Sequence, residues 1–105
     1  MSDVNGWENH STWLYNLWLS NDQGAVEYWN EQAAEVMEEA EATQYQSKKE
    51  AATRTLADLL IQQAESDAAE WLPDQASFYA DAINNALSSV SWREIAAALI
   101  DGVDN

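Results

Sequence analysis

The 105-residue sequence contains no cysteine, one histidine, one proline and three glycines. Without cysteine there is no disulfide framework, no thiolate nucleophile and no cysteine-ligated metal site. Because proline and glycine are the main breakers of helices, long stretches of Ala, Glu, Gln and Leu are left uninterrupted. The composition therefore predicts an all-α protein: one compact helical domain over residues 1–105, built as a bundle of four to five helices.

Positive charge is also scarce, with four Lys and Arg against 19 Asp and Glu and a formal net charge of −15. Direct binding to nucleic acid or to an anionic membrane needs clustered cations, so both are disfavoured. No apolar run approaches the roughly 20 residues that span a bilayer, and the N-terminus has no export-type pattern. We expect a cytoplasmic protein whose natural partners are basic proteins.

Motifs for catalysis, metals and cofactors are missing from the sequence. His10 lies beside Ser11, but neighbours at a helix start do not form a base and nucleophile pair. Glu35 and Glu38 could contribute to a di-metal centre, yet the Glu-x-x-His motif expected on partner helices is absent. The sequence predicts a protein that is not an enzyme and that binds no cofactor and no metal.

Helix-start and helix-end signals divide the chain into five segments. Ser47-Lys-Lys-Glu50 and Ser91-Trp-Arg-Glu94 have the form of capping boxes, in which a hydroxyl and a carboxylate each pair with a free backbone N–H. Pro73 ends the third segment and Gly102 is the expected stop of the fifth. The predicted helices cover about 12–20, 25–43, 48–72, 74–88 and 92–102.

Apolar residues recur at steps of three and four within these segments and predict their buried faces. The expected inner residues are Val26, Trp29, Ala33, Val36, Met37 and Ala40; Ala52, Leu56, Leu59, Leu60, Ala64, Ala68 and Trp71; Phe78, Tyr79, Ala82, Ile83, Ala86 and Leu87; and Trp92, Ile95, Ala96, Leu99 and Val103. The fourth segment carries the broadest apolar face.

The first predicted helix lies in the stretch STWLYNLWLSND, residues 11–22, and is apolar nearly all round. Such a helix is either central in the fold or covered by a partner. We predict that it is the central hub against which the longer helices pack. The alternative is an interface, with Trp7, Tyr15 and Trp18 as exposed anchors of the kind found at binding hot spots.

The second predicted helix carries a row of carboxylates opposite its apolar face: Glu27, Glu31, Glu35, Glu38 and Glu39. Like charges at i,i+4 cost about 0.2–0.5 kcal/mol per pair, so stability alone does not explain the row. Carboxylates at i,i+4 lie about 6 Å apart along the axis, whereas duplex DNA carries one charge per ~1.7 Å counting both strands. A second row would come from Glu65, Asp67, Glu70, Asp74 and Asp81. The competing interpretation is that the acids only solvate the surface, as in soluble proteins generally or in high-salt cells.

The N-terminal pattern Asn9-x-x-Thr12-Trp13-x-x-x-Leu17-Trp18-x-x-Asn21-Asp22 resembles the signature of a family of small, uncharacterised phage, plasmid and haloarchaeal proteins. His10 stands where that signature usually has tyrosine. The resemblance supplies no catalytic residue. It implies a mobile-element setting, in which small acidic proteins often inhibit host restriction or CRISPR machinery.

The leading hypothesis is a DNA mimic: an acidic inhibitor whose row of five glutamates occupies the nucleic-acid-binding surface of a basic host protein or defence complex. It would act in the cytoplasm of the host cell, as an anti-CRISPR or anti-restriction protein. The alternative is a structural or regulatory module that forms a homodimer through aromatic surface around Trp7, Trp13 and Trp18, with the acids serving solubility.

Overall fold

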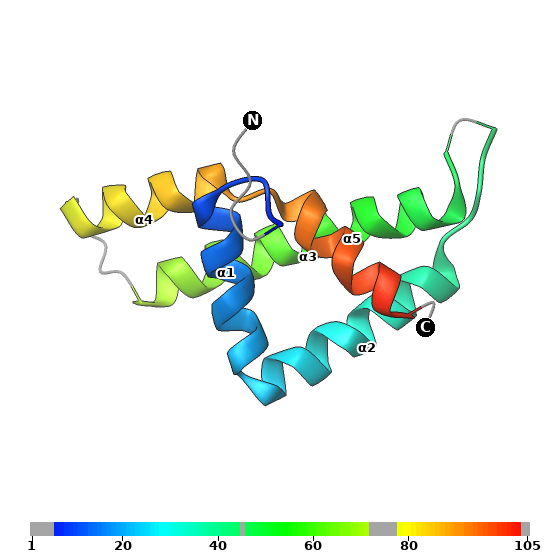
Figure 1. Cartoon of the computed structure of the whole chain (residues 1–105), viewed down its shortest axis with the longest axis horizontal. Helices are drawn as coiled ribbons and strands as arrows, with labels where there is room; N and C mark the ends of the chain where they lie inside the picture. The colour runs from blue at the N-terminus through cyan, green and yellow to red at the C-terminus, as the bar shows by residue number, and fades with distance from the viewer. Residues whose placement is uncertain (1–5, 45, 72–77, 104–105) are drawn as a thin grey trace.

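The computed structural model describes residues 6–44, 46–71 and 78–103, apart from the side chains of residues 71 and 78–81. Over these residues the chain forms five α-helices joined by short connections (Figure 1). They are α1 (His10–Asn21), α2 (Gln23–Glu39), α3 (Lys48–Trp71), α4 (Phe78–Ser89) and α5 (Trp92–Val103). The all-α bundle predicted from the sequence is confirmed.

Short polar side chains begin the first two helices. The side chain of Asn9 caps α1 by accepting a hydrogen bond from the backbone N–H of Thr12 at 2.9 Å. Asp22 ends α1 and also caps α2, because its carboxylate accepts from the N–H of Ala25 at 3.2 Å. One residue between two helices forces a sharp change of direction, which places α1 and α2 in a corner (Figure 1).

One of the two predicted capping boxes is confirmed. At the start of α3, the N–H of Glu50 donates to the Ser47 hydroxyl at 3.1 Å and the N–H of Ser47 donates to the Glu50 carboxylate at 3.3 Å. The box predicted at Ser91 is wrong, because the Glu94 carboxylate instead accepts from the backbone N–H of Glu8 at 2.9 Å. A partner 86 residues away thus takes the place of the local one.

Two predicted helix ends are also corrected. The second helix was expected to reach Thr43, but α2 stops at Glu39. Thr43 and Gln46 exchange backbone hydrogen bonds of 2.8 and 3.4 Å, and this tight turn competes with a further helical turn. Gly102 was expected to end the fifth helix, but α5 continues through it to Val103.

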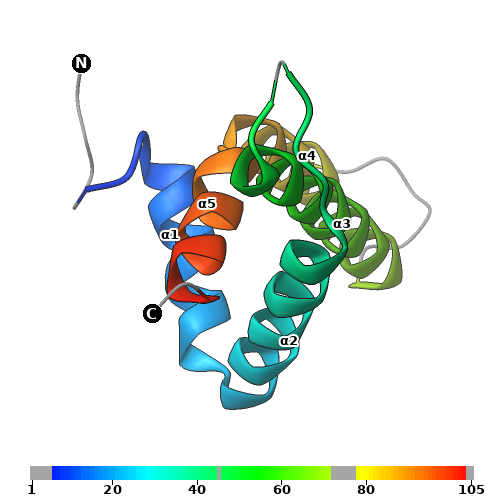
Figure 2. The same ribbon diagram turned by 90° about the vertical axis from the view of Figure 1, so that its right-hand side faces the viewer.

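The core is formed by α2, α3 and α5, which face one another in both views (Figures 1 and 2). Its buried residues include nine that the periodicity predicts: Trp29, Ala33, Val36, Ala52, Leu56, Leu60, Ala64, Ile95 and Ala96. Ala57, Val90 and Ile100 are buried as well and were not predicted. The expected inner residues Trp71, Phe78 and Tyr79 lie outside the described side chains. Burial of an aliphatic side chain contributes about 1.5–3 kcal/mol, so this cluster is the main source of stability.

The prediction that α1 is the central hub is wrong. Thr12 is its only buried residue, while the Trp18 side chain is 69% exposed and Leu14 and Leu17 are also exposed. Tyr15 and Leu19 pack against the core from its edge. The central position is occupied by α5, whose Ile95 and Ile100 are fully buried, so α1 covers one side of the bundle and leaves the rest of its apolar surface open.

The apolar face of α4 is not buried either. Ala82, Ile83 and Ala86 are exposed, and only Leu87 is half-buried. α4 contacts α1 and α3 and lies at one end of the molecule, away from α2 (Figures 1 and 2). Among the described side chains of α4, all except Leu87 are exposed, so the expected inner face borders solvent as the polar face does.

Candidate binding surfaces

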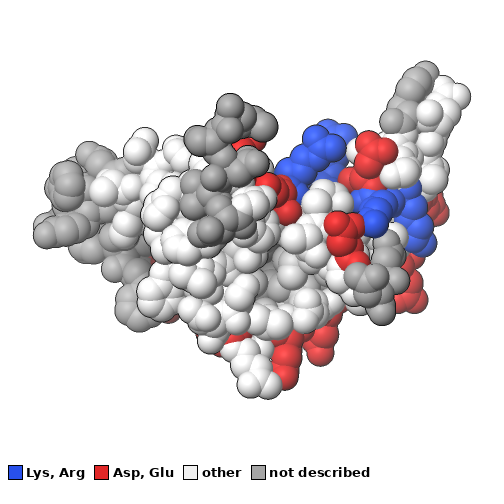
Figure 3. Space-filling view, in the orientation of Figure 1, with Lys and Arg blue, Asp and Glu red and all other residues white. Residues whose placement is uncertain are grey.

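The acidic stripe, defined as Glu27, Glu31, Glu35, Glu38 and Glu39, lies along the solvent side of α2. All five side chains are exposed, whereas Trp29, Ala33 and Val36 of the same helix are buried. The first and last members are twelve residues apart, which corresponds to about 18 Å at a rise of 1.5 Å per residue. Figure 3 shows Asp and Glu atoms along the edge of the molecule formed by α2. The predicted row of carboxylates is thus an accessible one.

No cation compensates this stripe. Within the described part of the chain, none of the five carboxylates forms an ion pair, and the one side-chain hydrogen bond to them comes from the Gln23 amide to Glu27 at 3.3 Å. Glu38 and Glu39 also lie in the last turn of α2, where the partial negative charge of the helix terminus disfavours carboxylates. The stripe therefore carries a cost in folding stability that a bound cationic partner would remove.

The start of α2 meets the second half of α3, and this junction brings two further acids together. Asp22 and Asp67 line a hollow of about 430 Å³ with Tyr28, Trp29 and Gln63. The Gln63 amide donates to the Asp67 carboxylate at 2.9 Å. Of the second row predicted from the sequence, Asp67 is half-buried here, and Glu65 and Glu70 are exposed on α3. Asp74 and the side chain of Asp81 lie outside the described residues.

Asp67 also acts on a half-buried aromatic residue. Tyr15 packs edge-on against Trp92, with ring centroids 4.8 Å apart. Burial raises the pKa of the Tyr15 phenol above its ordinary value of 10.0, and the negative charge of Asp67 raises it further. The Tyr15 phenol therefore keeps its proton to a higher pH than an exposed tyrosine does.

Positive charge is confined to the start of α3 and of α5, where Lys48, Lys49, Arg54 and Arg93 lie. Figure 3 shows Lys and Arg atoms on one side of the visible face, with Asp and Glu atoms beside them. Lys49 bridges the two helices through an ion pair of 2.7 Å with Asp101. Both side chains are about half exposed. Exposed ion pairs of this kind typically contribute only about 0–1 kcal/mol to the free energy of folding.

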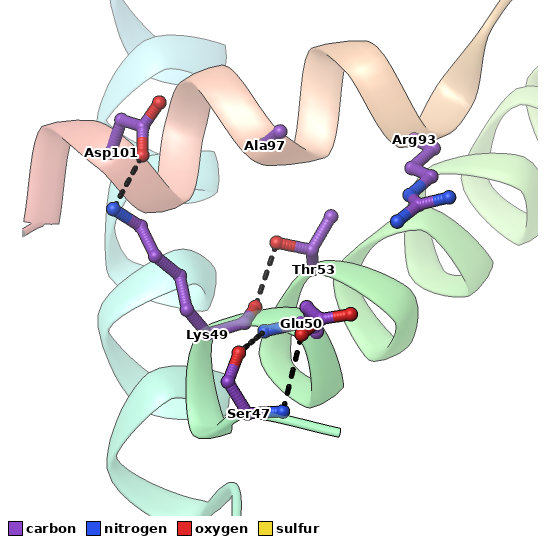
Figure 4. Close-up of a pocket in the computed structure, with 7 residues that line it drawn as sticks. All are labelled: Ser47, Lys49, Glu50, Thr53, Arg93, Ala97 and Asp101. Carbon is purple, nitrogen blue, oxygen red and sulfur yellow. Dashed lines mark hydrogen bonds and ion pairs between the residues drawn. The ribbon is translucent and has the colours of Figure 1, made fainter. Parts of the chain in front are cut away.

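Lys49 and Arg93 line a small cavity of about 270 Å³ between α3 and α5 (Figure 4). Figure 4 shows Lys49 reaching Asp101 and Arg93 extending into the space between the helices. Glu50 and Asp101 line the same cavity, so its two cations are matched by two carboxylates. A charge-balanced cavity of this kind has no net attraction for an anion.

A second exposed surface is apolar. The apolar groove, about 320 Å³ in volume, lies between α1 and α4 and is lined chiefly by Leu14, Tyr15, Trp18, Ile83, Leu87 and Val90. Two of the predicted interface aromatics, Tyr15 and Trp18, belong to it. Trp7 is half-buried against the core instead, and Trp13 packs beside the His10 ring at 5.3 Å. The sequence pattern predicted Ile83 and Leu87 to face the core and did not identify them as residues of an open groove. Their spacing is the same as that of buried apolar residues on a helix.

The N-terminal motif has a structural role that sequence patterns did not reveal. The Thr12 hydroxyl donates to the Asn9 side chain at 2.9 Å and accepts from the backbone N–H of Ser91 at 2.8 Å. The Asn9 amide in turn donates to the carbonyl of Ser89 at 2.8 Å. Asn9 and Thr12, two residues of this N-terminal motif, thus fasten α1 to the turn between α4 and α5.

Residues that bear on catalysis or metal binding are dispersed. His10 is exposed on the first turn of α1. Over residues 6–44, 46–71 and 78–103, no three His, Cys, Asp or Glu side chains are grouped so that they could hold a metal ion. In the same residues, no helix is long and apolar enough to cross a bilayer.

In comparisons with models of protein families, with curated proteins and with solved structures, nothing matches this chain. The resemblance of its N-terminal stretch to phage and plasmid proteins therefore stays a prediction. The functional argument depends on the two exposed surfaces, the acidic stripe and the apolar groove.

Proposed function

We propose that this protein is a non-enzymatic inhibitor that mimics nucleic acid and binds the DNA- or RNA-binding surface of a basic host protein. The observation that carries the proposal is the acidic stripe: five exposed carboxylates on one helix, without a compensating cation. The N-terminal resemblance to phage and plasmid proteins favours a host defence complex, of the CRISPR or restriction type, as that partner.

The spacing of the acidic stripe supports this choice of partner. Carboxylates four residues apart, such as Glu27, Glu31 and Glu35, lie about 6 Å apart along α2, whereas one strand of DNA presents a phosphate about every 3.4 Å. One helix thus offers fewer charges than a strand, but it offers them in a line of about 18 Å on a rigid support. A row of Lys and Arg side chains that follows a phosphate backbone can pair with such a line.

The repulsion within the stripe also favours a cationic partner. Its carboxylates repel one another on the free protein, and Glu38 and Glu39 oppose the dipole of α2. Lys or Arg side chains brought by a partner relieve both costs at once. Electrostatic attraction between surfaces of opposite charge mainly raises the association rate. Salt screens this attraction beyond about 8–10 Å at physiological ionic strength.

The proposal is tested by capture from a host lysate with immobilised protein, at low and moderate salt, in the presence and absence of added duplex DNA. Nucleic-acid-binding proteins should be retained by the wild-type chain and released by salt or by DNA. Charge reversal of Glu31, Glu35 and Glu38 to lysine should abolish their retention.

A matched control places the same change of charge elsewhere. Glu8, Asp58 and Asp101 are exposed and lie outside both α2 and the second row predicted from the sequence, so their replacement by lysine alters net charge equally without touching the stripe. Retention of the same proteins by this control and their loss from the α2 variant would support the proposal. Equal retention by both variants, or retention that added DNA does not change, would exclude it.

A further inference from the structure

The apolar groove between α1 and α4 combines an open hollow with an exposed aromatic side chain. Trp18 is 69% exposed at its rim, and Leu14 and Ile83, from opposite walls, are 39% and 40% exposed. Single exposed apolar residues are normal on protein surfaces, but a contiguous patch that surrounds a hollow is typical of an interaction site. Aromatic residues such as Trp are also the most common anchors of protein interfaces.

The groove is surrounded by uncharged chain. Residues 9–21 and 82–92, which form both walls, contain no Asp, Glu, Lys or Arg, although the protein carries a net charge of −15. Two copies that approach one another through their acidic surfaces bring like charges together, and each such contact is unfavourable. The α1–α4 face is one that two copies can share without burying a carboxylate.

We propose that this groove is the interface between two copies of the chain. A two-fold dimer requires a surface that is complementary to itself, because the same patch serves both partners. The α1–α4 face meets this requirement: it presents Trp18 as a projecting side chain and the hollow between Leu14, Ile83 and Leu87 as a receiving site. Each copy inserts its indole into the groove of the other.

The charge distribution favours a second copy over a basic partner at this site. A basic protein is attracted to the acidic stripe on α2, and its charge gains no electrostatic attraction from an uncharged face. The dimer does not use the stripe, so the two surfaces are independent. They also respond to salt in opposite ways, since screening weakens attraction at the stripe and reduces repulsion between two acidic copies.

The proposal is tested by sedimentation equilibrium of the full chain over a range of protein concentrations. The wild-type protein should dimerise, and Trp18→Asp should raise the dimer Kd by about tenfold or more, the loss expected for an interface anchor. Ile83→Asp, on the opposite wall, should have the same effect. Tyr28→Asp is the matched control, because Tyr28 is an exposed aromatic residue of α2 outside the groove.

Circular dichroism of each variant checks that the helices are retained. Raising NaCl from about 0.05 M to about 0.5 M should leave the dimer intact or tighten it. A wild-type chain that stays monomeric, a Trp18→Asp protein that dimerises as well as the wild type, or a dimer that salt dissociates would overturn the proposal. None of these outcomes affects capture of basic proteins by the acidic stripe, so the two proposals fail separately.

Discussion

The hydroxyl of Thr12 accepts a hydrogen bond of 2.8 Å from the backbone N–H of Ser91, which is 79 residues further along the chain. Thr12 is fully buried, and the same hydroxyl donates to the side chain of Asn9. This pair fixes α1 at the edge of the core although most of the apolar surface of α1 faces solvent. It thereby holds one wall of the apolar groove in place.

Thr12→Val should lower the free energy of unfolding by about 1–3 kcal/mol, because the substitution leaves the Ser91 N–H without its partner in a partly buried position. Chemical denaturation measures this loss. Thr12→Ser is the control, since it keeps the hydroxyl and removes only a methyl group. If the serine variant were as unstable as the valine variant, the hydrogen bond would not be the cause.

Glu39→Gln should make the protein more stable, by about 0.3–1 kcal/mol at low ionic strength, because Glu39 is in the last turn of α2 and opposes the helix dipole. Glu27→Gln removes the same charge near the other end of the helix and should stabilise less. The comparison requires urea titrations of both variants at low salt. An equal increase in the free energy of unfolding for both variants would show that the dipole at the helix terminus does not destabilise Glu39.

Tyr15 should make stability fall at alkaline pH. Because burial raises its pKa above 10.0 in the folded state, the folded chain holds the phenolic proton more tightly than the unfolded chain does. This contribution is complete below the unfolded pKa and is lost as the pH rises through the folded one. Above pH 10 the free energy of unfolding of the wild type should therefore fall relative to that of Tyr15→Phe, whereas a difference that does not change with pH would contradict the burial of the phenol.

The melting temperature should rise with KCl only until repulsion among the carboxylates is screened, with a plateau at roughly 0.3 M. Differential scanning calorimetry across a KCl series measures this dependence. A melting temperature that climbs steadily into molar KCl would instead favour high-salt solvation as the purpose of the acidic surface.

Features that depend on neighbouring residues were predictable from the sequence. The Ser47 and Glu50 capping box forms because both partners lie within one turn and no distant group competes for them. The acidic stripe and the buried face of α2 were also predicted, since a helix separates charged and apolar residues by their period alone. These features include every residue of the proposed nucleic-acid mimic.

Features that depend on which helices meet were not predictable. Glu94 was expected to cap its own helix, but the N–H of Glu8 binds its carboxylate. The sequence of α1 is apolar on nearly every side, so its period could not show which side faces the core. The spacing of Ile83 and Leu87 likewise does not show whether these side chains face the core or solvent. For this reason the groove could be recognised only in the structure.

The most direct test of the nucleic-acid mimic is a competition measurement on a partner recovered by capture. Labelled duplex DNA is bound to the partner, and the protein is added while fluorescence anisotropy reports the bound fraction. The wild-type chain should displace the DNA, with an affinity that falls as salt rises, and the lysine variant at Glu31, Glu35 and Glu38 should not. A ternary complex in which DNA stays bound, or equal displacement by the variant, would contradict the account.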